Sequence, residues 1–461
     1  MAVKIQKEPF KPYGMPWQFF AIFSVIVLIA TMVGVLPKGM AGCFAFLIVF
    51  STVLNEIGNR TPIVRTYLGG GAIVIIFGMG FLRYMNFFGV FDLFVGPDKA
   101  GVTYTAQLMK NIETFFKPSG AFLDFYIAAL ICGSILGMNR KLLVKAAARY
   151  FPAIFGAIFC SFLLTGLYGA ISGFGVVKCL LLIALPIMGG GMGAGAVPLS
   201  KIFESSGTMT AEEAISIMNP AVAIGNAVSI VLGGLLVKLI ASRKWNGHGQ
   251  LMQVGVADAS EFDISPEMKE KREHITVQNM GIGMFVAISF FAWGYIVAKL
   301  WSTLVPAVNI HAYAWMIITV AICKIFNLLP EFIEVACYQW FQFIMKMLTT
   351  TLMAGIGLCY LSLDVVVSTF SLNYLIMCIL ACTGAFLGAA LVGKLVGFYP
   401  VESGITAGLC MSNMGGTGDV AVLSAANRLE LMPFAQISSR LGGAIILIIG
   451  SLLLSTLGTL L

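Results

Sequence analysis

Long apolar stretches alternate with short polar connections over most of the chain. An α-helix of about 20 apolar residues crosses the hydrocarbon core of a bilayer. Stretches of roughly this length recur throughout the sequence, which predicts an all-α polytopic membrane protein with about eleven transmembrane helices. We place these spans at residues 17–36, 40–57, 67–85, 121–138, 152–172, 214–241, 280–302, 311–329, 347–362, 372–396 and 436–460.

Two further apolar segments, at 177–206 and 401–425, are interrupted by clusters of glycine. Both clusters fit the pattern Gly-Gly-x-Gly-x-x-Ala-Val, beginning at Gly190 and at Gly415, and Pro186 lies just before the first. Glycine costs about 1 kcal/mol in a helix interior relative to alanine, so a packed cluster should end a helix. Bare backbone in a membrane is tolerated only where it faces protein or a water-filled cavity. Paired interruptions in two halves point to a transporter's binding site, so we predict two re-entrant hairpins.

Basic residues in the short connections predict the orientation of the spans. They precede the first span and follow the second, fourth and sixth, as at Lys4, Arg60, Arg140 and Arg243. These positions share one side if the N-terminus is cytoplasmic. The two hairpins then open to opposite faces.

The same orientation predicts an inverted repeat of five spans plus a hairpin, preceded by one extra N-terminal span. We divide the chain into an N-terminal tail with the extra span at 1–38, a first repeat at 39–241, a cytoplasmic linker at 242–279 and a second repeat at 280–461.

Composition supports a membrane protein and excludes other classes. Hydrophobic residues make up 59% of the chain and charged residues 11%, against about 25% charged in soluble domains. The net charge of +7 comes from residues scattered among short connections, a distribution that argues against nucleic-acid binding. The ten cysteines form no Cys-x-x-Cys pair, so structural disulfides and a zinc site are not expected.

Arg440 falls inside the last predicted span. An arginine at membrane depth costs at least about 2.5–3.5 kcal/mol and usually faces a pathway or a partner. Its planar fork matches a carboxylate, which suits an anionic substrate. The alternative is a structural ion pair with Asp419 or Glu402. We expect Arg428 and Lys394, by contrast, to be anchors at the membrane interface.

Ends of broken helices add two attractions. Exposed N–H groups favour carboxylates, and exposed carbonyls favour a hard cation such as Na⁺. A phosphate-binding loop is disfavoured because neither glycine cluster ends in Gly-Lys-Ser/Thr or follows a predicted strand. Close helix packing by small residues remains an alternative for both clusters. A membrane-embedded enzyme would need a His-Glu-x-x-His motif or a Ser/His pair at membrane depth, and neither is present. A channel would commonly be lined by several subunits.

Four strings carry a family resemblance: residues 185–191, 195–200, 404–410 and 435–443. With them the chain resembles, over nearly its whole length, the bacterial 2-hydroxycarboxylate transporter family, which includes citrate/sodium symporters and malate and citrate carriers. The resemblance implies a homodimeric, elevator-like secondary transporter in the inner (plasma) membrane of a bacterium, whose hairpins hold a small carboxylate. We expect no cofactor and favour Na⁺ as the coupling ion.

The site residues follow from this resemblance and from the hairpin tips. The resemblance makes Arg440 the group that grips a substrate carboxylate and places Gly193, Gly416 and Thr417 along the substrate. It places Na⁺ near four residues, to which we add Gly193. The full predicted substrate set is Gly190, Gly191, Met192, Gly193, Met414, Gly415, Gly416, Thr417 and Arg440, and the Na⁺ set is Ile187, Gly193, Cys410, Asn413 and Ser439.

Two departures from the family's citrate/sodium symporters bear on the substrate. Met192 stands where those symporters have asparagine, and Met414 stands where they have a second substrate arginine. Losing that arginine removes a clamp worth about 1.5–3 kcal/mol, so we expect malate ahead of citrate. The Asn246–Gly249 string, Asn-Gly-His-Gly, is similar to the branch that exchanges malate or citrate for lactate. Asn413 and Asp419, however, resemble the sodium-coupled branch. Na⁺ symport is therefore the favoured prediction, with lactate exchange or H⁺ coupling as alternatives.

Overall fold

The computed structural model describes residues 11–67, 70–116, 121–137, 140–240, 244–252, 274–305, 310–415 and 417–461. All regular structure in these ranges is helical, and the one pairing of extended backbone is an isolated antiparallel bridge between Met252 and Phe398. The predicted all-α class is therefore confirmed for the described part of the chain.

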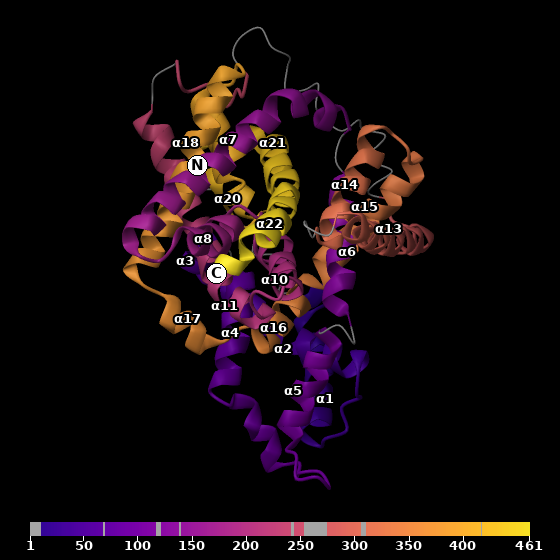
Figure 1. The fold of residues 1–461 in the computed structure, drawn as a ribbon. Helices are drawn as coiled ribbons and strands as arrows, with labels where there is room; N and C mark the ends of the chain where they lie inside the picture. The colour runs from indigo at the N-terminus through magenta and orange to yellow at the C-terminus, as the bar shows by residue number, and fades with distance from the viewer. Residues whose placement is uncertain are drawn as a thin grey trace, which may run out of the picture. The chain divides into compact units, whose positions relative to one another are not determined.

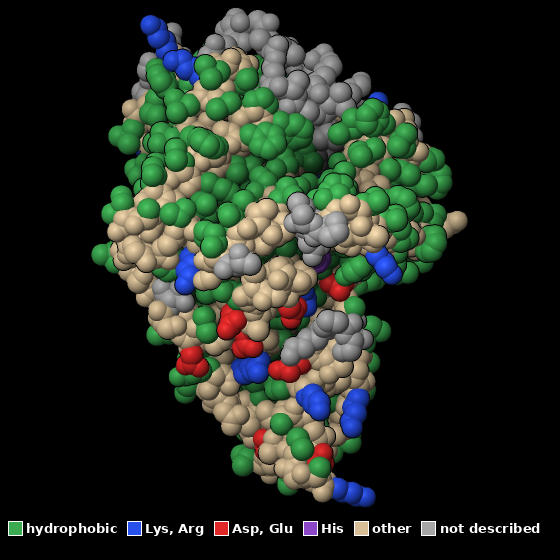
Figure 2. Space-filling model, viewed as in Figure 1, with side chains coloured by type: hydrophobic (Ala, Val, Ile, Leu, Met, Phe, Trp, Pro, Cys, Tyr) green, Lys and Arg blue, Asp and Glu red, His purple; other side chains and the backbone are tan. Residues whose placement is uncertain are grey.

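Helices of membrane-spanning length and composition account for much of the fold. Among the described residues, six qualify singly: Met40–Arg60, Tyr150–Ser172, Ala211–Leu239, Val277–Leu304, Leu372–Leu395 and Phe434–Leu457. Up to eight qualify if each of two pairs of consecutive helices is one span. These helices carry apolar side chains that other parts of the chain do not cover, for example Phe285, which is 71% exposed, and Phe159, which is 67% exposed. Figure 2 shows hydrophobic side chains spread over one face of the molecule, as expected for a surface that contacts lipid.

The helices form two compact units, which we describe separately. The smaller unit comprises the described residues of 1–65, 70–123 and 347–361. Its interior contains phenylalanine rings in edge-to-face contact, such as Phe46 with Phe88, whose centroids lie 5.4 Å apart. Its elements are η1 (Pro12–Gly14), α1 (Trp17–Met32), α2 (Met40–Arg60), α4 (Gly71–Tyr84), η2 (Phe87–Leu93), α5 (Tyr104–Phe116) and α16 (Thr349–Cys359). Helix α3 (Pro62–Tyr67) crosses the boundary along the chain.

The larger unit comprises the described residues of 66–69, 124–346 and 362–461 and contains both glycine clusters. Its elements, many of them labelled in Figure 1, are α6 (Phe122–Leu136), α7 (Arg140–Ser172), α8 (Val176–Cys179), η3 (Leu180–Ala184), α9 (Leu185–Ile187), η4 (Met192–Ala196), α10 (Val197–Ser205), α11 (Ala211–Leu239), α13 (Val277–Leu304), α14 (Ala312–Ile325), α15 (Glu331–Met347), α17 (Leu363–Thr369), α18 (Leu372–Leu395), α19 (Pro400–Ser403), η6 (Gly404–Leu409), α20 (Thr417–Ala425), η7 (Leu429–Leu431), α21 (Met432–Ile437), η8 (Ser438–Gly442), α22 (Gly443–Leu457) and η9 (Gly458–Leu460).

Small residues allow the long helices of this unit to approach closely. Helices α7 and α18 pack along much of their length. A Cβ at Gly388 would lie 1.9 Å from the carbonyl oxygen of Gly156, and one at Gly384 would lie 2.5 Å from that of Cys160. The two backbones are therefore in direct contact, which larger side chains would prevent.

Both predicted helix breaks are present. In the first hairpin, α9 ends at Ile187 and η4 begins at Met192, with Gly190 and Gly191 in left-handed conformations at φ 78° and 113°. In the second, η6 ends at Leu409 and α20 begins at Thr417, with Gly415 at φ 64°. Glycine adopts such conformations without the steric cost that a Cβ brings. Local sequence was therefore sufficient to predict where these helices break.

Helix α15 (Glu331–Met347) was not among the predicted spans. It carries Glu331, Glu334 and Lys346, which lowered its apparent hydropathy. The structure pairs Glu334 with Lys324 of α14 at 2.6 Å, and both side chains are buried. An ion pair between neighbouring helices thus neutralises charges in the interior, and the hydropathy pattern of the sequence does not show this pairing. The count of eleven spans and the inverted repeat stay predictions.

Candidate functional site

The tips of the two glycine clusters lie against each other within the larger unit. A Cβ added to Gly191 would lie 2.7 Å from the carbonyl oxygen of Met414, and one added to Gly415 would lie 3.0 Å from that of Gly190. Residues more than 220 positions apart in the sequence are thus in backbone contact. No side chain larger than hydrogen fits at Gly191 without displacing the backbone of Met414, which faces it.

The π-helical turn η8 completes the same junction. A Cβ at Gly190 would lie 2.4 Å from the carbonyl oxygen of Ser439, and one at Gly443 would lie 2.7 Å from that of Gly189. Turns with wider hydrogen-bond spacing interrupt helices at functional sites in many proteins. Here η8 brings Ser439 and Arg440 to the level of both hairpin tips.

Polar side chains hold the second tip. The Asn226 side-chain oxygen of α11 accepts a hydrogen bond from the Met414 backbone N–H at 3.1 Å. The Asn413 side-chain oxygen accepts one from the Gly415 N–H at 2.6 Å. These contacts satisfy backbone groups that the helix break exposes, which is necessary in an apolar surrounding.

Asp419 is a fully buried carboxylate at the start of α20. One of its oxygens accepts a hydrogen bond from the Asn413 Nδ2 at 3.0 Å, and the other accepts one from the Ser439 Oγ at 2.9 Å. No direct ion pair to Asp419 is found among the described residues, but the positive charge of Arg440 acts on its carboxylate through space. A buried negative charge is costly unless a positive charge compensates it. Carboxylate and hydroxyl oxygens, such as those of Asp419 and Ser439, are also ligands that hard cations prefer.

Arg440 lies next to this cluster in the sequence and is partly exposed. Its guanidinium carbon sits 5.7 Å from the ring centroid of Phe341 in α15, within the range of a cation–π contact. Such a contact is made by the flat face of a guanidinium, whose N–H donors lie along its edge. Glu402, one of the two ion-pair partners considered from the sequence, is instead paired with Arg428.

The structure brings together most of the predicted site residues. Gly190, Gly191, Met192, Gly193, Met414, Gly415, Asn413, Ser439 and Arg440 lie at the two tips or in η8. Ile187 ends α9 against Gly225 of α11, and Cys410 follows η6 with its side chain buried. Since thioether, thiol and alkyl groups are poor Na⁺ ligands, Ile187 and Cys410 could offer only carbonyl oxygens. Gly416 and the Thr417 side chain lie outside the described residues.

Two polar residues of this cluster were absent from the predicted site. Asp419 was considered as a partner for Arg440 and as a residue similar to the sodium-coupled branch, but it was not placed in the site, although its position four residues after Gly415 in the repeated pattern was a usable signal. Asn226 gave no such signal, because an asparagine within an apolar span is more often a packing residue than a loop support. Only the fold shows that Asn226 faces the tip of a hairpin 188 residues further along the chain.

The expectation that Arg428 is an interface anchor was wrong. Its side chain is 9% exposed and its Nε lies 3.2 Å from a carboxylate oxygen of Glu402, which is fully buried. Lys394, expected to be a second anchor, is exposed and lies 4.4 Å above the ring of Trp245. A local pattern could place both basic residues near span ends, but it could not reveal that a carboxylate 26 residues away neutralises Arg428.

Comparison with known proteins gives this site a context. The sequence model of the 2-hydroxycarboxylate transporter family matches residues 13–452. The malate transporter MleP of Lactococcus lactis subsp. lactis (strain IL1403) is 36% identical over 442 residues, which cover 96% of this chain and 97% of that protein. The citrate/sodium symporter of Salmonella typhimurium is 36% identical over 447 residues, 97% of this chain and 95% of that protein. The citrate transporter CitP of Leuconostoc mesenteroides is 34% identical over 438 residues, 95% and 92%.

Proposed function

Because the chain belongs to the 2-hydroxycarboxylate transporter family, we propose that it carries 2-hydroxycarboxylates across a membrane by secondary active transport, with malate ahead of citrate. The family and these relatives are transporters and not enzymes. The observation that carries the proposal is the meeting of two broken-helix tips with Ser439 and Arg440. Broken helices at one depth expose backbone donors and acceptors where a hydrophilic solute needs them.

In this proposal Arg440 binds a substrate carboxylate. Its guanidinium edge presents two parallel N–H donors, which match the two oxygens of a carboxylate. The amides at the tips, near Gly191 and Gly193, bind the remaining oxygens of the substrate. The same backbone groups bind the 2-hydroxyl group, since carbonyls and amides alternate along a glycine-rich loop.

Na⁺ is the proposed coupling ion, and Asp419 is its negative ligand. Ser439 contacts one oxygen of Asp419 through its hydroxyl, whose oxygen would also bind the cation, and Asn413 holds the other oxygen through its Nδ2. Binding of Na⁺ would neutralise the buried charge and hold the second tip beside Arg440, which couples ion binding to substrate binding. The name of the Salmonella relative, a citrate/sodium symporter, supports this choice.

Malate stands ahead of citrate because of the residues at positions 192 and 414. Met192 and Met414 are apolar and lie at the tips, so the site has one basic clamp instead of two. A dicarboxylate has one carboxylate fewer to neutralise than citrate. The runner-up is exchange of malate or citrate for lactate, which the names of the malate and citrate transporters among the relatives leave open.

Uptake into proteoliposomes tests the proposal. Labelled malate, citrate and lactate are offered with and without a Na⁺ gradient, with a proton gradient, and with lactate inside. Saturable malate uptake that requires external Na⁺ is the expected result. Uptake driven only by internal lactate would favour the exchanger, and a lack of saturable uptake for all three acids would overturn the transport proposal.

Substitution of Arg440 tests the carboxylate clamp. Loss of a bidentate charged contact worth about 1.5–3 kcal/mol should raise the KM for malate by about 10-fold to 150-fold in Arg440→Ala. Arg440→Lys should retain part of the affinity. Arg60→Ala removes an exposed arginine paired with Glu56 and serves as the matched control, with unchanged KM. Equal KM values for the wild type and Arg440→Ala would exclude this role.

The wider architecture is part of the same proposal. It comprises about eleven spans, an inverted repeat, a homodimer in the bacterial inner membrane, a cytoplasmic N-terminus and an elevator-like movement of the hairpin-bearing unit. Cysteine accessibility from each side of the membrane, read at Lys38 and Trp245, tests the orientation. Labelling of Trp245→Cys from outside in intact cells would contradict it.

A further inference from the structure

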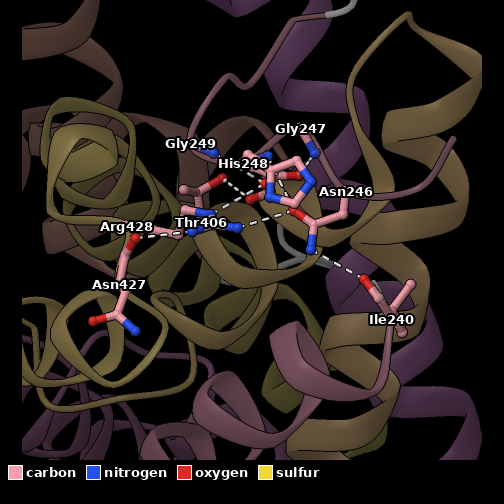
Figure 3. A network of polar contacts seen from close by, with 9 residues as sticks. Ile240, Asn246, Gly247, His248, Gly249, Thr406, Asn427 and Arg428 are labelled. Carbon is pink, nitrogen blue, oxygen red and sulfur yellow. Dashed lines mark hydrogen bonds and ion pairs between the residues drawn. The ribbon is translucent and has the colours of Figure 1, made fainter. Parts of the chain in front are cut away.

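A short segment after α11 packs across the base of the second hairpin. We define this segment, Trp245–Met252, as the base strap. It contains the Asn-Gly-His-Gly string that the sequence analysis singled out and that the substrate site does not use. Figure 3 shows Asn246, Gly247, His248 and Gly249 of this segment gathered with Arg428 in one network of polar contacts.

Glu402 belongs to the first arm of the hairpin, in α19, and its carboxylate is fully buried. It accepts hydrogen bonds from the Gly247 N–H at 2.8 Å and the Gly249 N–H at 3.3 Å. The Nε of Arg428 donates a third, at 3.2 Å. The carboxylate therefore binds two backbone groups of the base strap and one side chain of the hairpin.

Arg428 follows the second arm, α20, and closes the network from the other side. Besides Glu402, its Nη2 donates to the side-chain oxygen of Asn246 at 2.9 Å and its Nη1 donates to the Asn427 carbonyl at 2.9 Å. Asn246 is 2% exposed. Each of the three nitrogens of the guanidinium thus has its own acceptor, and the ion pair joins the two arms at their base.

Backbone contacts fix the base strap along the first arm. The Val401 N–H donates to the Trp245 carbonyl at 2.9 Å and the Tyr399 N–H donates to the Leu251 carbonyl at 2.9 Å. Met252 and Phe398 form the isolated antiparallel bridge. These contacts lie on both sides of the Glu402 network, so the base strap is held at its two ends as well as at its centre.

The residues of the string suit this position. A Cβ at Gly247 would lie 2.2 Å from the Gln250 carbonyl oxygen and 2.3 Å from a ring carbon of Tyr399. His248 and Gly249 have left-handed conformations, at φ 51° and 100°, which turn the N–H groups of Gly247 and Gly249 toward one carboxylate. The Asn246 side chain also donates to the Ile240 carbonyl of α11 at 3.0 Å, which connects the network to the end of that helix.

We propose that Glu402, Arg428 and the base strap position the second hairpin: they lock its two arms together at the base, and the base strap moves with the hairpin as one unit during transport. Separating the partners of a buried ion pair leaves uncompensated charges, so the arms cannot separate at this end without a large loss of stabilising free energy. The tip at Asn413 and Gly415 then keeps its place opposite the first hairpin. For its transport readout the inference rests on the proposed function.

Kinetics of the ion-pair variants test the positioning role. Glu402→Gln keeps an acceptor for the base strap but removes the charge that faces Arg428. A tip displaced by about 1 Å can cost about 100-fold in efficiency, so we expect a rise in the KM for malate of that order in protein that remains monodisperse. Glu334→Gln, which breaks the buried Lys324 pair away from the hairpins, should lower the amount of folded protein and leave the KM unchanged. Matching KM values for Glu402→Gln and the wild type would overturn the positioning role.

A reversible cross-link tests the shared movement. Bridge partners on antiparallel strands have Cβ atoms about 4.5–5.5 Å apart, near disulfide range, so Met252→Cys/Phe398→Cys should cross-link with copper phenanthroline. Cross-linking needs no substrate, so its yield tests the base strap independently of the proposed function. The two single-cysteine variants, treated alike, control for the ten native cysteines.

Transport by the cross-linked protein decides the proposal. If the base strap moves with the hairpin, the oxidised double variant transports within about twofold of the same sample after reduction with dithiothreitol, since no separation is needed in the cycle. Transport that stops on oxidation and returns on reduction would show that the base strap must detach, and would overturn the inference. Failure to cross-link would do the same.

Discussion

Gly191 at the tip of the first hairpin offers a test whose size follows from the structure. An alanine Cβ there would lie 2.7 Å from the Met414 carbonyl oxygen and 2.9 Å from its carbon. The backbone there, at φ 113° and ψ −178°, adds a conformational cost of roughly 1–3 kcal/mol for a residue with a Cβ. Overpacking against backbone typically costs about 1–3 kcal/mol more, and only the state with both tips in contact bears that second cost.

Gly175→Ala separates the two costs. Gly175 lies at φ 96° just before α8 and the first hairpin, and a Cβ there meets nothing within 4 Å. Both variants therefore carry the backbone strain, and only Gly191→Ala pushes the tips apart. A difference of about 1–3 kcal/mol in the population of the contact state corresponds to a factor of about 5–150.

Malate counterflow in proteoliposomes measures that factor. We expect Gly175→Ala to keep the KM of the wild type, with some loss of thermal stability. Gly191→Ala should raise the KM by a factor of about 5–150. If the two variants have the same KM, contact between the tips does not form the binding site and the reasoning from the glycine geometry is refuted.

Three further substitutions test other parts of the account. Asp419→Asn removes the buried negative charge beside Asn413 and Ser439. It should raise the Na⁺ concentration for half-maximal uptake at least about tenfold. An unchanged Na⁺ dependence would show that Asp419 is not part of the ion site. Met414→Arg restores a second basic group and should lower the KM for citrate relative to malate by about tenfold or more, as competition between the two labelled acids would show; a preference that does not move would exclude a direct role for position 414. Glu334→Gln should destabilise the protein by about 3–5 kcal/mol, because it leaves the buried Lys324 without its partner, and a thermal unfolding scan in detergent checks this value.

The helix breaks were predictable because their causes are local. Glycine and proline alter the backbone at their own positions, so the breaks could be predicted from Pro186, Gly190 and Gly415 without any knowledge of the fold. Repetition of one pattern in two halves then indicated that the breaks belong together. In the structure the two breaks do lie together, since Gly191 contacts the backbone of Met414.

Long-range charge compensation was not predictable from the same pattern. From the sequence, Arg428 was expected to be an interface anchor and Glu402 was considered as a partner of Arg440, and Glu334 lowers the apolar character of α15. A charged side chain can be buried without a large loss of stability only when the fold brings a partner within hydrogen-bonding distance, at 3.2 Å for Arg428 and 2.6 Å for Lys324. Asn226 shows the same limit, since its role depends on a loop from the other half of the chain.

Substrate binding where the two hairpins meet is the central claim of this account. Counterflow of labelled malate, measured side by side in the wild type, Arg440→Ala and Arg60→Ala, tests it most directly. The account predicts saturable counterflow in the wild type and in Arg60→Ala, and a KM raised by about 10-fold to 150-fold in Arg440→Ala. Counterflow with the same KM in all three proteins would contradict it.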